Sequence, residues 1–167
     1  MPLYFPFSSR RLLATLNAVS SNINNTETVA LQALIPAGSW LVGTMIEFPN
    51  LVATKSGTTD SGTIKIRVGT AGTSADTQIL TNGSLGAANR AWNGQAAMRL
   101  NSATTVLPIG GNSGGFQQGT SNSALTAITI SSATANALYV SITLASSSTN
   151  DTVALAMGSI WLVDRVG

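Results

Sequence analysis

The sequence predicts an all-β protein built as an antiparallel sandwich or barrel, on three observations. Short segments of alternating apolar and polar residues recur along the chain, and stretches rich in Gly, Ser, Thr and Asn separate them. In the clearest segment, 63–69, Ile64, Ile66 and Val68 fall on one face, because successive side chains of a strand point to opposite sides. Apolar residues make up 44% of the 167 residues, which is enough to bury a single core.

Predicted strands follow one another from residue 27 onward, with turn-forming residues such as Pro36 and Gly38 between them. The segments are 27–35, 39–48, 50–54, 63–69, 77–81, 95–100, 104–109, 126–131, 137–145 and 152–164. No boundary divides this region. The sequence therefore predicts one β-sandwich domain over 27–167 and an N-terminal arm over 1–26.

The arm has two parts. Its first nine residues carry three aromatic side chains around two prolines, and we expect them to be extended, because proline disfavours helix in the residue before it. Farther on, apolar residues at steps of four, three and four predict a short amphipathic helix within 11–23. These apolar residues are Leu12, Leu16, Val19 and Ile23.

Two hypotheses apply to the aromatic part of the arm. Either it folds back onto its own domain, or it docks on another protein and anchors the chain there. In the second case the two neighbouring arginines would meet acidic groups of the partner. The anchoring residues would be Tyr4, Phe5, Phe7, Arg10 and Arg11.

The last predicted strand, 152–164, is apolar on both faces. Such a strand needs cover on both sides, whereas a two-layer sandwich covers only one. A neighbouring copy of the chain would cover the second face, and a loop of the same chain is the alternative. The predicted subunit-interface residues are Leu155, Met157, Ile160, Trp161 and Leu162.

The residue inventory gives little support for catalysis. The chain has no histidine and no cysteine, which removes the usual nucleophile–histidine pairs and the common zinc sites. Its six carboxylates are scattered, so we expect no catalytic, cofactor-binding or metal-binding residue and no enzyme activity. Glu47 is expected to be partly buried and paired with Arg67 or Arg99, since a buried carboxylate needs a partner.

Charge and hydropathy argue against two classes of partner. Charged residues make up only 8% of the chain and the net charge is +2, which is too small and too scattered for nucleic-acid binding. No apolar run approaches the ~18 to 20 residues of a membrane span. The N-terminus places its aromatic residues before its arginines, which is the wrong order for a secretory signal.

One polar segment is a candidate ligand loop. Trp92 and Asn93 lie among Asn, Arg and Gln residues, where a tryptophan could stack on a sugar ring or anchor an interface. Packing at the edge of the core is the alternative. The glycine-rich run 109–116 lacks the lysine of a phosphate-binding loop and is predicted to be a flexible surface loop.

The first half of the β region resembles small virion proteins of tailed phages. The pattern comprises IPAG at 35–38, GTIKIRVGT at 62–70 and ADT at 75–77. Domains with this pattern are jelly-roll β-sandwiches, commonly trimeric, that decorate capsids as cement proteins or form the tips of head and tail fibres. The resemblance implies a jelly-roll fold, a trimer, and action by binding.

We therefore expect a homotrimeric decoration protein that binds the major capsid protein on the outer capsid surface of the virion and stabilises the phage head. The short stretch before the β domain favours a complete small subunit over a fibre shaft. One alternative is a receptor-binding fibre tip, in which loops 82–95 and 110–123 contact a host glycan. Another is a stand-alone lectin-like module.

Overall fold

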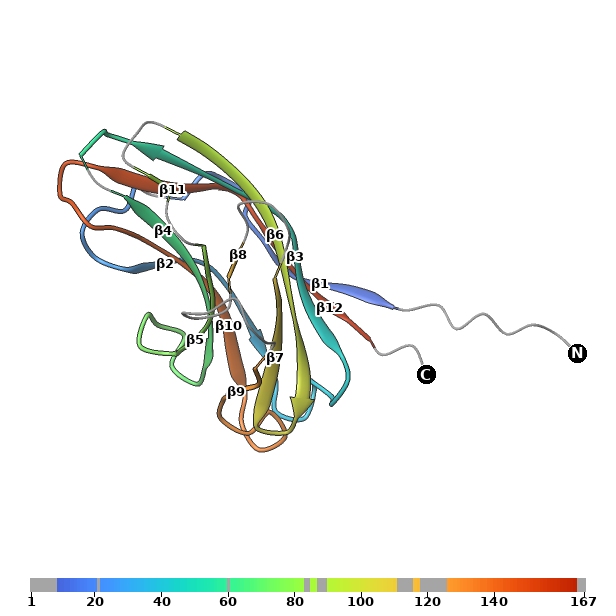
Figure 1. Ribbon diagram of the computed structural model, residues 1–167. Helices are drawn as coiled ribbons and strands as arrows, with labels where there is room; N and C mark the ends of the chain where they lie inside the picture. The colour runs from blue at the N-terminus through green and yellow to red at the C-terminus, as the bar shows by residue number, and fades with distance from the viewer. Residues whose placement is uncertain are drawn as a thin grey trace, which may run out of the picture.

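The computed structural model describes residues 9–20, 22–59, 61–82, 85–86, 90–110, 116–117 and 126–164. These residues form two antiparallel sheets that pack face to face, as Figure 1 shows. The prediction of an all-β sandwich is confirmed.

The two sheets differ in size. Across the seven-stranded sheet, called here the large sheet, the order is β1 (Arg10–Thr15), β12 (Ser159–Val163), β3 (Met45–Ser56), β6 (Arg90–Ser102), β7 (Thr105–Gly110) and β9 (Ile128–Thr129). Its seventh strand, β11 (Thr152–Met157), pairs with the other end of β3. Across the five-stranded small sheet the order is β2 (Thr28–Ile35), β10 (Leu138–Ser146), β4 (Gly62–Gly69), β5 (Thr77–Asn82) and β8 (Phe116–Gln117).

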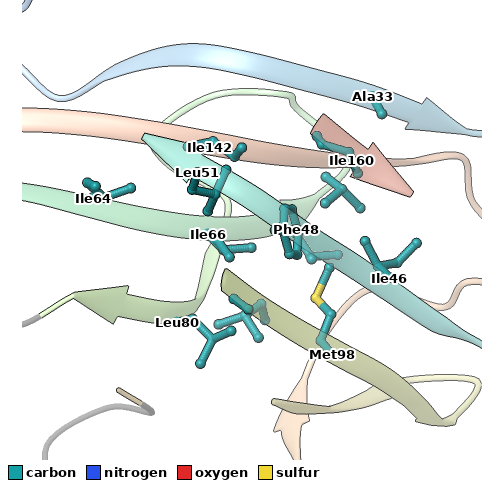
Figure 2. Packing of buried hydrophobic residues seen from close by; sticks show 14 of the residues in the cluster. Ala33, Ile46, Phe48, Leu51, Ile64, Ile66, Leu80, Met98, Ile142 and Ile160 are labelled. Carbon is teal, nitrogen blue, oxygen red and sulfur yellow. The ribbon is translucent and has the colours of Figure 1, made fainter. Parts of the chain in front are cut away.

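The core lies between the sheets and takes the inward faces of strands from both. Ile64, Ile66 and Val68 of β4 are fully buried, as their alternation predicted. Figure 2 shows Ile66 and Phe48, from opposite sheets, directed into the same apolar layer. Burial of a side chain of this size contributes about 1.5–3 kcal/mol to folding, so this layer supplies most of the driving force.

Strand β3 replaces two predicted strands. The segments 39–48 and 50–54 were expected to be separate, but one strand runs from Met45 to Ser56 with a bulge at Pro49 and Asn50. The residues before Met45 form a turn instead. There the amide and the hydroxyl of Thr44 both donate to the carbonyl of Leu41, at 3.0 and 2.7 Å.

The predicted helix within 11–23 is wrong. Strand β1 covers the first part of that segment and pairs antiparallel with β12. Beyond β1, the amide of Leu16 donates to the carbonyl of Gly158 and the amide of Ser20 to that of Leu155, both at 2.9 Å. The segment thus satisfies its backbone on the edge of the large sheet, and this tertiary context overrides the helical spacing.

The predicted strand 152–164 is divided at Gly158 into β11 and β12, and the register shifts at the end of β11. The inward residues are odd-numbered in β11, such as Leu155, and even-numbered in β12, such as Ile160. The core face therefore changes parity at a bulge between the two strands. Within β12 the prediction of two apolar faces holds, because Trp161 and Val163 are partly exposed on the other face.

A buried ion pair lies beside the connection between β3 and β4. The ammonium of Lys55 donates to Oδ2 of Asp151 at 2.8 Å and to the carbonyl of Gly57 at 2.7 Å. The two side chains are 0% and 1% exposed. Gly57 has a φ of +103°, and a side chain there would meet the Asp151 carboxylate. The turn and the ion pair thus require each other.

Candidate docking face

Part of the outer face of the large sheet is apolar. In β3, Ile46 and Phe48 point into the core, so the residues between and beside them point outward. The same alternation holds in β6, β7 and β12. We call the outward apolar residues of these strands and of β1 the platform: Leu12, Met45, Ala97, Leu107, Ile109, Trp161 and Val163.

The strand register makes the platform continuous. One row of neighbouring residues consists of Leu12, Trp161, Glu47, Ala97 and Ile109. The next row consists of Arg10, Val163, Met45, Arg99 and Leu107. Because directly opposed and diagonal side chains on one face lie within reach of each other, these residues form one surface rather than isolated apolar positions.

An ion pair stands on the platform. The guanidinium of Arg10 donates to Oε2 of Glu47 at 2.6 Å and lies 5.1 Å from the centroid of the Trp161 ring. The prediction that Glu47 pairs with Arg67 or Arg99 is wrong, because β1 brings Arg10 onto the same face. Arg10, expected to meet an acidic group of another protein, is paired within its own chain.

The outer face of the small sheet is polar. The carboxylate of Glu27 accepts hydrogen bonds from Arg67 Nε at 2.5 Å, Lys65 Nζ at 2.7 Å and Thr143 Oγ1 at 2.6 Å. Burial alone would raise the pKa of Glu27, but the hydrogen bonds from Arg67, Lys65 and Thr143 outweigh it and lower that pKa from 4.5 to about 2. The surface of this sheet therefore satisfies its own charges.

Three of the five predicted interface residues belong to the core. Leu155, Ile160 and Leu162 are at most 2% exposed, because their own chain encloses them. Their side chains are not free for the subunit contact expected of them. Met157, which is 54% exposed, and Trp161, which is partly exposed, do reach the surface.

The predicted arm residues are divided between two settings. Tyr4, Phe5 and Phe7 lie outside the described residues. Arg10 and Arg11 lie in β1, at the edge of the large sheet, and both are exposed. The described part of the arm therefore includes a strand of the domain.

The predicted ligand loop is part of strand β6. Trp92 lies opposite Ala53 and Asn93 opposite Val52. Trp92 is partly buried against the core, and its ring occupies the space that a side chain at Gly94 would need. Packing, the alternative considered for Trp92, is confirmed. Asn93 is exposed on the outer face of the large sheet.

Sequence reasoning missed the contribution of β6 and β7 to the platform. A signal was present in β7, where Val106 and Pro108 are buried while Leu107 and Ile109 face outward. Four consecutive apolar residues with no register shift among them make a strand that is apolar on both faces. Strand β12 has the same property, because Ile160 and Leu162 lie in the core while Trp161 and Val163 face outward.

Comparison of the chain with protein-family models, with curated proteins and with solved structures found no match. Among the described residues, no group of three or more Asp, Glu, His or Cys side chains could hold a metal ion. The described part of the chain also contains no helix of the length and apolarity needed to cross a bilayer. The fold and its surface define a β-sandwich protein with an apolar platform on the outer face of the large sheet and a charged cluster on the outer face of the small sheet.

Proposed function

We propose that this protein is a structural virion protein, a decoration (cement) protein that binds the outer capsid surface of a tailed phage as a homotrimer and acts by binding rather than catalysis. The observation that carries the proposal is the contrast between the apolar platform and the polar outer face of the small sheet. The sequence pattern at 35–38, 62–70 and 75–77 supports the same class of protein.

The contrast matters because large contiguous apolar patches are uncommon on monomers and mark sites of association. In a strand with one solvent-exposed face, polar residues on that face alternate with apolar residues in the core, as on the sheet face that bears Glu27. The platform instead presents Trp161, Leu12 and Val163. We propose that copies of the chain meet through the platform.

The finer fold that goes with this function is a jelly roll. Its support is the path of the chain, which repeatedly changes sheets. The changes fall between β1 and β2, β2 and β3, β3 and β4, β5 and β6, β7 and β8, β8 and β9, β9 and β10, and β10 and β11. A jelly roll is two sheets joined by such crossings.

The capsid contact is assigned to the segment before β1. Residues 1–8 supply Tyr4, Phe5 and Phe7, and Arg11, which follows them in the sequence, adds an exposed charge. The partner is the major capsid protein, with acidic groups that Arg11 would meet. Repetition of this contact in a trimer raises avidity without any new contact.

Trimer formation is tested with two matched leucines. Leu12 is 45% exposed on the platform, and Leu34 is 51% exposed on the outer face of the small sheet. We expect the wild type and Leu34→Glu to sediment at about three times the mass of one chain, and Leu12→Glu to sediment as a single chain. A wild type that stays a single chain at high concentration would overturn the trimer.

The capsid contact is tested separately. The variant lacks residues 1–8. The deletion stops there because Arg10 and Arg11 belong to β1, and thermal unfolding checks that the shortened protein is folded. We expect the shortened protein to remain folded and trimeric but not to co-sediment with empty phage heads, whereas the full chain does. Undiminished co-sedimentation of the shortened protein would remove the arm as the anchor.

A further inference from the structure

A groove of about 390 Å³ opens on the outer face of the large sheet, next to the platform. It lies where β3 bulges. The register passes from Phe48 opposite Ala96 to Leu51 opposite Gly94, so that Pro49 and Asn50 share a single position of β6. Bulges occur next to binding sites because they re-aim side chains and interrupt strand pairing.

A second irregularity bounds the groove on its other side. The register shift in β11 brings Met157 opposite Val52, and the Met157 side chain is 54% exposed. Two bulges on neighbouring strands thus leave a hollow between β6 and β11, with β3 beneath it. The volume is at the lower end of the range typical of small-molecule sites.

The groove is lined by uncharged polar side chains together with apolar ones. Three amide side chains line it, from Asn50, Asn93 and Gln95, and all three residues are exposed. The apolar wall includes Met157 and Val52. No charged side chain lies among the described residues that line it.

We propose that this groove binds an uncharged carbohydrate. A side-chain amide offers both donors and an acceptor, and a sugar hydroxyl likewise donates and accepts, so three amides suit a cluster of hydroxyl groups. The apolar wall suits the C–H face of a sugar ring. The absence of charge in the described lining disfavours a phosphate, a carboxylate or an ammonium group as the recognised chemistry.

Trp92 is a positioning residue in this proposal. Its ring packs over Gly94, in the space that a side chain there would fill, and Gly94 lies between the two amide residues Asn93 and Gln95. The packing holds this part of β6 in place from the core side. The sugar therefore contacts the amides and Met157, and the indole does not stack on it.

The test is a titration of ¹⁵N-labelled protein with glucose, galactose, mannose and N-acetylglucosamine, and with their short oligosaccharides. The side-chain NH₂ signals of Asn50, Asn93 and Gln95 report the site directly. We expect at least one sugar to shift these signals. Asn93→Ala and Gln95→Ala should each weaken binding roughly three- to tenfold.

Asn101→Ala is the matched control, because Asn101 is an exposed amide on β6 outside the groove, and it should leave the affinity unchanged. The proposal is overturned if no probe shifts the three amide signals, or if binding persists unchanged in the Asn50→Ala, Asn93→Ala, Gln95→Ala triple variant. This inference does not depend on capsid decoration. Sugar binding is read from amide signals, whereas decoration is read from mass and co-sedimentation, so either result can fail alone.

Discussion

At the scale of single residues, the surface of the small sheet is organised by Glu27. One carboxylate accepts hydrogen bonds from two cations and a hydroxyl, at 2.5 to 2.7 Å from Arg67 Nε, Lys65 Nζ and Thr143 Oγ1. Glu27 precedes β2, Lys65 and Arg67 lie on β4, and Thr143 on β10. The cluster therefore joins three neighbouring strands of the sheet from outside.

The lowered pKa of Glu27 predicts a pH dependence of stability. Its pKa is about 2 in the folded chain and 4.5 ordinarily, so the unfolded chain binds more protons between these values. The stabilisation is complete above pH 4.5 and is lost as the pH falls toward 2. We expect Glu27→Gln to lower the free energy of unfolding by about 1–2 kcal/mol at pH 7, after allowance for solvent screening.

Urea unfolding at several pH values measures this effect. The difference between wild type and Glu27→Gln should shrink as the pH falls below 4.5. Glu47→Gln is the control, because its partner Arg10 is 47% exposed and such pairs contribute little. The prediction would be contradicted if the difference in free energy of unfolding between wild type and Glu27→Gln stayed constant from pH 7 down to about pH 2.

Asp151 carries a second residue-scale prediction. Asp151→Asn leaves the ammonium of Lys55 buried without its counter-charge, which should cost about 3–5 kcal/mol in the free energy of unfolding. Replacing both residues, as Lys55→Met with Asp151→Leu, should recover most of that loss, because no buried charge remains. Thermal and urea unfolding check both variants. If Asp151→Asn were as stable as the wild type, water would have to reach the ammonium of Lys55, and the prediction would be wrong.

At the scale of elements, strand β6 depends on a close approach between Trp92 and Gly94. A β-carbon at Gly94 would overlap the indole ring. Gly94→Ala should therefore destabilise the protein by roughly 1–3 kcal/mol through overpacking, although alanine is otherwise the better strand residue.

The double variant Gly94→Ala with Trp92→Ala isolates that contact. The added methyl group should cost much less in the Trp92→Ala background, and the coupling free energy from urea unfolding of the four proteins measures the difference. Equal costs in both backgrounds would show that the strain lies in the backbone of β6 instead.

Strand β1 depends on its pairing with β12 for its place in the large sheet. Its residues bind the free edge of β12, and this pairing places Arg10 over Trp161 and beside Glu47. From residue 10, the arm that was expected to anchor the chain on another protein is part of the large sheet.

At the scale of the whole molecule, the two outer faces predict concentration-dependent stability. If copies associate through the platform, the folded state is stabilised by mass action and Tm rises with protein concentration. We expect this rise for the wild type and for Leu34→Glu. Leu12→Glu should show a Tm that does not change with concentration. Scanning calorimetry over a wide concentration range tests it, and a flat wild-type Tm would argue against association.

The sequence by itself determined what depends on alternation within one strand. Most of the strands, the inward faces of β4 and β10, and the absence of catalytic histidine and cysteine could all be read locally, because the two-residue period of a strand needs no partner. The polar outer face of the small sheet follows from the same period, as the alternation of Lys65 and Arg67 with the buried isoleucines shows.

Only the tertiary structure decided which strands lie side by side and where their registers break. Strand β1 exists because β12 offers an edge, Glu47 pairs with Arg10 because of that edge, and Leu155 and Ile160 share one core because a bulge changes parity between them. These are contacts between residues distant in sequence. The physical reason is that alternation is local, whereas pairing depends on backbone groups that come together only in the folded chain.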